Sequence, residues 1–180
     1  MIDSKKKWFI LYTRAGMEKR VSNLLTRKKV ENYFPINRQM ISRKKVLLEP
    51  VFSSYVFVKI EDIYLVNLRT IEGVINCAYW LGRPAIIRNE EINILKRFLN
   101  EYSTINLEKV PFDMEGSFRT SDPSTLEQYD YEISVKNNSI KLVLPSIGYI
   151  VTAELEKSQV EIYNTKKLPI EISEKFQFAI

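Results

Sequence analysis

The sequence predicts an α+β fold in two parts, a β-α-β-β-α-β unit with a largely antiparallel sheet and a smaller all-β unit after it. Strand-like and helix-like segments alternate in that order up to about residue 103. Beyond that point the periodicity fades, and it resumes as short apolar segments at even spacing. With 180 residues, of which 45% are hydrophobic, the chain can bury the core of one ordinary domain and a smaller one.

The first part begins with a strand at 7–13, in which successive side chains alternate between two apolar faces. A helix at 17–29 follows, because apolar residues recur at i, i+4, i+7 and i+8 from Met17. Two further strands and a basic loop or hairpin tip between them complete this half, at 32–41, 53–60 and 42–50.

The second half of this unit repeats the alternation. A helix is predicted at 61–71, and strands follow it at 73–81 and 82–88. The last helix, at 89–102, has an apolar stripe made of Ile92, Leu95, Phe98 and Leu99. The order is that of a ferredoxin-like split βαβ unit, which we place at residues 1–103.

The remaining chain predicts a small β-barrel. Three short strands at 8–10-residue spacing indicate it, with the sequences SIKLVL, YIVTAEL and SQVEIY at 139–144, 149–155 and 158–163. We expect a linker at 104–111, the barrel at 112–165 and a C-terminal tail at 166–180.

Aromatic residues recur on one face of the predicted sheet. In a split βαβ sheet the strands at 7–13 and 53–60 are neighbours, so Tyr12 can lie beside Tyr55 and Phe57, with Trp8 completing an aromatic patch. Helices covering this face would make the patch core. Because Lys59 shares the face and the opposite face is aliphatic, we expect an exposed binding surface instead.

Positive charge is concentrated at the N-terminal end. Residues 1–48 hold thirteen Lys or Arg against three acidic residues, a net charge of +10, whereas residues 49–180 carry −5. A solvated, solubilising surface is the ordinary explanation for such a run. Its confinement to one third of the chain favours a polyanionic partner, of which nucleic acid is the obvious candidate.

The composition argues against catalysis. There is no histidine, and the five glycines are isolated, so no glycine-rich phosphate loop exists. The one cysteine, Cys77, can form neither an internal disulfide nor, by itself, a zinc site. We expect a protein that is not an enzyme and needs no cofactor or metal. No apolar run is long enough for a membrane span or a signal peptide, so a cytoplasmic location is expected.

Two families place an aromatic patch on central strands. The RNA-recognition motif is matched by SSYVFVKI only at Tyr55, Phe57 and Val58, and a single-stranded RNA-binding module is therefore the alternative interpretation. The segments WFILYTRAGMEKRVSNLL, YFP, EPVFSSYVFVKI and GVINCAYWLGRPAII resemble, in order and spacing, the N-terminal domain of NusG-family transcription elongation factors. Ser53 and Ser54 replace the family's Pro-Gly pair, and the departures resemble the specialised RfaH-like and UpxY-like antiterminators.

The resemblance implies an operon-specific factor that suppresses pausing and termination, and UpxY-type members serve long polysaccharide operons. In the family the aromatic patch binds the clamp helices of the RNA polymerase β′ subunit. The matching positions here are Trp8, Tyr12, Tyr55 and Phe57. The domain also reaches the lobe of the β subunit, through a segment that matches 64–69 and lacks the His-Thr-Thr run of RfaH-like members.

Specialised members of the family also bind the exposed non-template DNA strand with basic residues. Arg14, Arg20 and Arg27 match such positions, and charge alone adds Lys19, Arg43, Lys44 and Lys45. Phosphate contacts would supply affinity, and bases splayed onto the surface would supply any sequence preference.

The family's second domain is a small KOW barrel with a Gly-Pro-Phe-x-Gly turn, which this sequence lacks. We therefore expect a degenerate KOW-like barrel at 112–165. In the family this domain recruits Rho or a ribosomal protein, and in RfaH-like members it masks the polymerase site as a helical hairpin. With the turn absent, Rho and a ribosomal protein stay candidate partners only, and the Val, Ile and Tyr content favours strands over the helical form.

Overall fold

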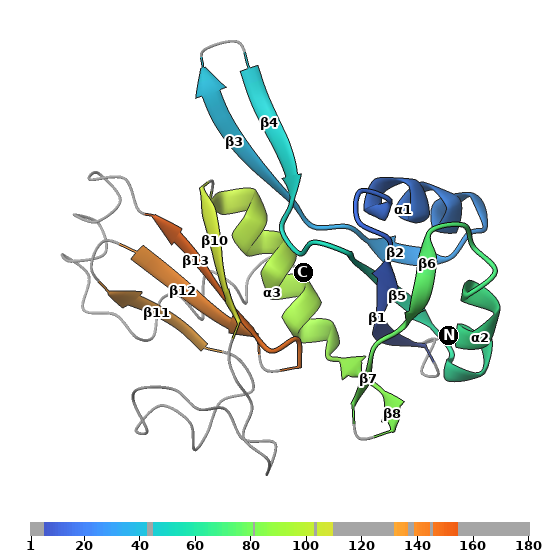
Figure 1. The fold of residues 1–180 in the computed structure, drawn as a ribbon. Coiled ribbons are helices and arrows are strands. Elements are labelled where there is room, and N and C mark those ends of the chain that lie inside the picture. The colour runs from blue at the N-terminus through green and yellow to red at the C-terminus, as the bar shows by residue number, and fades with distance from the viewer. Residues whose placement is uncertain are drawn as a thin grey trace. The chain divides into compact units, whose positions relative to one another are not determined.

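The computed structural model describes residues 6–42, 45–80, 82–102, 104–109, 132–136, 139–144 and 146–154. The chain divides into two compact units, Met1–Leu99 and Asn100–Ile180, each described here by itself (Figure 1). No helix among the described residues is both long enough and apolar enough to cross a membrane.

The sheet of the first unit has the strand order β2-β5-β1-β6, and every neighbouring pair is antiparallel. A short strand, β9, also pairs with β1. The predicted split βαβ topology is thereby confirmed, with β1 and β5 in the middle. The strands span β1 Lys7–Thr13, β2 Glu31–Tyr33, β5 Tyr55–Ile60, β6 Val74–Cys77 and β9 Ile86–Ile87.

The helices of this unit are α1 (Glu18–Arg27), a 3-10 turn η1 (Asp62–Tyr64) that leads into α2 (Leu65–Leu68), and α3 (Asn89–Glu101). The aliphatic face of β1 and β5 packs against α1 and α2, as the alternation predicts. Its buried residues include Phe9, Leu11, Val56, Val58, Val21, Leu25, Leu65 and Leu68. The helix predicted at 61–71 is shorter, with a 3-10 turn at its start and an end at Leu68.

The strand predicted at 32–41 is broken at Pro35, which has no N–H to donate to a ladder. The chain then forms β3 (Ile36–Ser42), which pairs with β4 (Lys45–Pro50) as a separate two-stranded ribbon. Figure 1 shows this ribbon extending away from the sheet of its unit. The predicted loop or hairpin tip at 42–50 is thus mostly the second strand of a hairpin.

A second small ribbon interrupts the strands predicted at 73–81 and 82–88. Here β7 (Tyr79–Trp80) pairs with β8 (Arg83–Pro84), and Gly82 between them has a φ of +76°. The break falls at Ala78, whose N–H donates to the Ile10 carbonyl while its own carbonyl accepts the Ala85 N–H. The ribbon therefore stays attached to β1 through Ala78.

The second unit contains a four-stranded antiparallel sheet in the order β10-β13-β12-β11. The strands predicted at 139–144 and 149–155 are β12 (Ser139–Leu144) and β13 (Tyr149–Glu154). Two strands were not expected: β11 (Glu132–Lys136), and β10 (Ile105–Lys109), which occupies the segment predicted as a linker. The linker prediction is wrong there because β10 pairs with β13 over five residues. The strand predicted at 158–163 and the tail at 166–180 lie outside the described residues, and barrel closure stays a prediction.

Candidate interaction site

Aromatic rings form a continuous row on the face of the sheet opposite the aliphatic core. Tyr12 and Tyr55 are Cα partners across β1 and β5, with ring centroids 5.2 Å apart in an edge-on arrangement. Phe52 stacks on Tyr55 and meets Phe57 edge-on, and Phe57 stacks on Tyr33 at 6.3 Å. We call these five residues the aromatic row.

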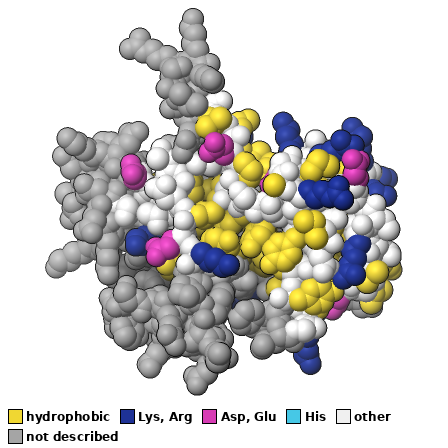
Figure 2. Space-filling model, in the orientation of Figure 1, with side chains coloured by type: hydrophobic (Ala, Val, Ile, Leu, Met, Phe, Trp, Pro, Cys, Tyr) yellow, Lys and Arg dark blue, Asp and Glu magenta, His cyan; other side chains and the backbone are white. Residues whose placement is uncertain are grey.

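The four residues predicted to bind the polymerase differ in their exposure to solvent. Tyr12 is 38% exposed and Tyr55 is half-buried, whereas Trp8 is 3% exposed and Phe57 is fully buried. The expectation of one exposed patch therefore holds only at its tyrosine end. Figure 2 shows hydrophobic side chains gathered on the visible face of the first unit, with Lys and Arg side chains beside them.

Tyr33, at one end of the row, and the buried Trp8 are both contacted from α3. The ammonium group of Lys96 lies 5.3 Å from the centre of the Trp8 ring and 5.1 Å from that of Tyr33. Both distances are within cation–π range. Burial also raises the pKa of the Tyr33 hydroxyl, so this ring stays neutral next to the lysine. Trp8 and Tyr33 therefore hold α3 on the sheet rather than facing a partner.

A tight turn fixes where Tyr55 enters its strand. The Tyr55 N–H donates to the Phe52 carbonyl, and Ser54 has a φ of +64°. The Ser54 N–H donates to the Glu18 carboxylate at 2.7 Å, and the Ser54 carbonyl accepts the Thr13 N–H at 2.8 Å. Because Glu18 is only 3% exposed, this bond is sheltered from water. The turn therefore joins the end of β1, the start of α1 and the start of β5.

Sequence reasoning missed the role of Glu18. An acidic residue in the first turn of a helix is ordinarily assigned to the helix dipole. The available signal was the turn itself: the family's Pro-Gly pair, replaced here by Ser53 and Ser54, indicates a positive φ, and such a turn leaves a backbone N–H to satisfy. Glu18 satisfies that donor and so positions the tyrosine pair.

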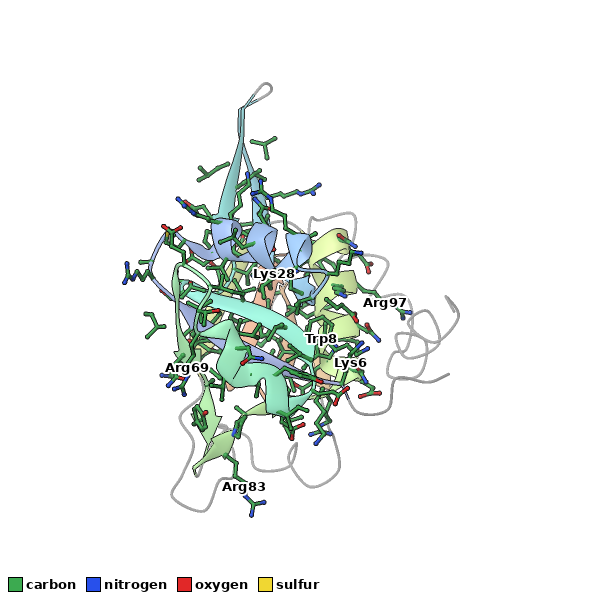
Figure 3. The ribbon with its side chains drawn as sticks, turned by 90° about the vertical axis from the view of Figure 1, so that its right-hand side faces the viewer. Lys6, Trp8, Lys28, Arg69, Arg83 and Arg97 are labelled. Carbon is green, nitrogen blue, oxygen red and sulfur yellow. The ribbon has the colours of Figure 1, made fainter. Side chains whose placement is uncertain are left out.

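The basic residues predicted to bind nucleic acid are exposed on α1 and the turn before it. They are Arg14, Lys19, Arg20 and Arg27, with Lys28 following at the end of the helix (Figure 3). Arg20 and Arg27 are seven residues apart, about 10 Å along the helix axis. Arg43 and Lys44 lie outside the described residues, and the side chain of Lys45 does too, so the ribbon tip adds nothing to the described site.

Arg20 is not a free cation. Its Nη2 donates to Glu72 Oε2 at 2.6 Å, which connects α1 to the turn before β6. The backbone brings Arg14 to the same place, because its N–H donates to the carbonyl of Gly73 at 2.8 Å. Arg14 and Arg20 therefore share one end of the basic surface, and a carboxylate lies within it.

Two further features belong to the described part of the first unit: the exposed segment at 64–69 and the buried thiol of Cys77. The segment matching the β-lobe contact exposes Tyr64 and Val66, and Arg69 at its end donates weakly to the Tyr79 hydroxyl at 3.5 Å. Cys77 is buried under the same region. Burial raises the pKa of its thiol to about 11, and the charge of Arg69 opposes part of that rise.

A solved structure described as "Domain interaction in Thermotoga maritima NusG" is 18% identical, covers 87% of this chain and 96% of that chain, and has a TM-score of 0.47. No curated protein matches the sequence. The family model described as "Transcription termination factor nusG" matches residues 6–96, half of the chain and all elements from β1 into α3. The chain belongs to the NusG family of transcription factors.

Proposed function

We propose that this protein is an operon-specific transcription antitermination and elongation factor that binds the clamp helices of the RNA polymerase β′ subunit. The observation that carries the proposal is the ring pair of exposed Tyr12 and half-buried Tyr55, held side by side on the central strands. An accessible aromatic pair on a rigid support is suited to be the anchor of a protein interface. Trp8 and Phe57 lie on the same face of the sheet and are buried.

The mechanism needs only binding energy. A factor that binds the active, closed-clamp polymerase more tightly than the paused form shifts that equilibrium by its differential affinity. A difference of about 1.4 kcal/mol changes the ratio of the two forms about tenfold. The segment at 64–69 would contact the β-subunit lobe, and Arg14, Arg20 and Arg27 would contact the non-template strand.

The remaining parts of the proposal follow from the resemblance of the sequence to specialised members of the NusG family. Long polysaccharide operons are the proposed targets, and the cytoplasm is the proposed location. Rho or a ribosomal protein is the proposed partner of the second unit. The alternative, a single-stranded RNA-binding module, would use the same two tyrosines to stack on bases.

Capture of purified RNA polymerase, and of its isolated β′ clamp-helix fragment, tests the proposal. The variant is Tyr12→Ala with Tyr55→Ala, because both rings are accessible and Phe57→Ala would open the core. Ile75→Ala is the matched control, since this side chain is 59% exposed on β6 and lies outside both the aromatic row and the segment at 64–69. We expect the double variant to lose at least tenfold in affinity for both targets, and the control to bind as wild type does.

Circular dichroism and thermal unfolding of each variant separate lost contact from lost fold. Equal capture by a folded double variant would contradict the proposal. Failure of the wild type to bind polymerase, together with tight binding of free single-stranded RNA that the double variant loses, would establish the RNA-binding alternative.

A further inference from the structure

In the basic surface of α1, the carboxylate of Glu72 is hydrogen-bonded to the guanidinium group of Arg20, a residue predicted to contact nucleic acid. Glu72 and Arg20 are separated by 52 positions in the chain, yet their side chains meet at 2.6 Å. Both side chains remain open to water, 61% and 59% exposed. The pair is therefore accessible to a ligand approaching the end of α1.

The backbone fixes the position of Glu72. The next residue, Gly73, has a φ of +93°, and a Cβ there would meet Val21 Cγ2 at 3.0 Å and Met17 Cβ at 3.1 Å. The preceding residue, Ile71, is buried. The turn thus lies directly against α1, and it can deliver a side chain at position 72 to Arg20 and to the neighbouring Arg14.

Stability gives little reason for this pair. Exposed ion pairs contribute about 0–1 kcal/mol, because water screens the attraction and two long side chains lose freedom. We expect the Glu72 carboxylate to affect the affinity for a bound polyanion more than it affects the stability of the fold. A carboxylate at this point repels a phosphate, and it also occupies the donors that Arg20 would offer to that phosphate.

We infer that Glu72 is a specificity-determining residue, whose carboxylate competes with single-stranded DNA phosphates for Arg20 and thereby weakens sequence-independent binding. The inference rests on the proposed function, in which α1 contacts the non-template strand. A factor restricted to few operons gains from weak background binding, because non-specific sites vastly outnumber its targets. A counter-charge on the contact residue achieves this without removing the contact.

Fluorescence anisotropy of a labelled twelve-residue oligo-dT tests the inference in the full chain. Glu72→Gln should bind about threefold more tightly than wild type at low salt, and its log–log salt slope should steepen by about 0.7, one further phosphate contact. Asp62→Asn is the matched control. It removes one exposed carboxylate that pairs with Lys7 at 3.8 Å, on the unrelated turn η1. The control should bind as wild type does.

A second variant pair shows whether the effect passes through Arg20. In an Arg20→Gln background, Glu72→Gln should lose most of its gain. Equal gains from Glu72→Gln and Asp62→Asn would overturn the inference in favour of net charge. No gain, or no oligonucleotide binding by any variant, would overturn it as well. Polymerase capture by the wild-type protein is read separately, so the proposed function can stand where this inference fails.

Discussion

Ser54 shows how one residue can be kept in an unfavourable conformation by its neighbours. A φ of +64° costs a side-chain-bearing residue roughly 1–2 kcal/mol relative to a right-handed conformation. The turn Phe52–Tyr55 has its positive φ at the third position, as a type II turn does, and such turns favour Pro-Gly in the middle. Ser53 and Ser54 stand at those two positions. The hydrogen bond from the Ser54 N–H to buried Glu18 holds this conformation although the turn has neither proline nor glycine.

The residue-scale prediction is that Ser54→Gly stabilises the protein. Glycine adopts this φ without steric cost, so the free energy of unfolding should rise by about 1 kcal/mol. Urea denaturation followed by tryptophan fluorescence measures it. Ser53→Gly is the matched control, because Ser53 has no positive φ and gains nothing from glycine. Equal effects at the two positions would show that the turn is not strained.

At the scale of elements, one lysine attaches α3 to the sheet. Lys96 contacts the faces of Trp8 and Tyr33, one ring on β1 and the other on β2, an edge strand. The helix thereby covers one end of the aromatic row and leaves the tyrosine pair accessible. The attachment combines the packing of the lysine stem with the charge of its ammonium group.

Lys96→Met separates these two contributions, because methionine keeps an unbranched stem and removes the charge. We expect the free energy of unfolding to fall by about 1 kcal/mol, measured by denaturant unfolding. Lys19→Met is the control for charge removal on an exposed helix position. A loss of similar size in the control would assign the effect to net charge rather than to the two rings.

The sequence predicts the elements with strong periodicity and misses those set by distant contacts. The helices α1 and α3 and the central pair β1–β5 follow from apolar spacing. The two-residue strands do not, because β9 depends on pairing with the distant strand β1, while β7 and β8 form a hairpin too short to show any alternation. The pattern predicts β3 as a continuation of β2 and β4 as part of a basic loop or hairpin tip, although Pro35 is a local signal for the break.

The sequence predicts which residues form the site, but it does not predict which of them are exposed. Alternation assigns Trp8 and Phe57 to a face, but it cannot say what covers that face. Lys59 is one of the two arguments for exposure, beside the aliphatic opposite face, and it fails for a physical reason. Lys59 is half-buried and its ammonium group lies 3.8 Å from Glu31, its cross-strand partner on β2. A lysine paired with a glutamate on the edge strand β2 is compatible with a covered face.

For the whole molecule, the uneven charge is the feature with a direct experimental consequence. The N-terminal third carries +10 and the remainder −5. If Arg14 and Arg27 each contact a phosphate while Glu72 holds Arg20, the log–log salt slope of single-stranded DNA binding is about −1.4. Affinity for oligo-dT should then fall about 25-fold between 50 and 500 mM salt, as measured by anisotropy. Arg27→Gln should make the slope shallower by about 0.7, and a flat response would leave the charge a solubilising role.

The buried thiol of Cys77 has a practical consequence for labelling. It is the only cysteine in the sequence, and a pKa of about 11 leaves about one thiol in ten thousand as reactive thiolate at pH 7. Towards maleimide dyes the native protein should therefore behave as if it had no cysteine. A cysteine introduced at exposed Ile63 would accept a single fluorophore without any prior substitution, and its emission could follow, in real time, the arrival of the protein at a transcribing polymerase.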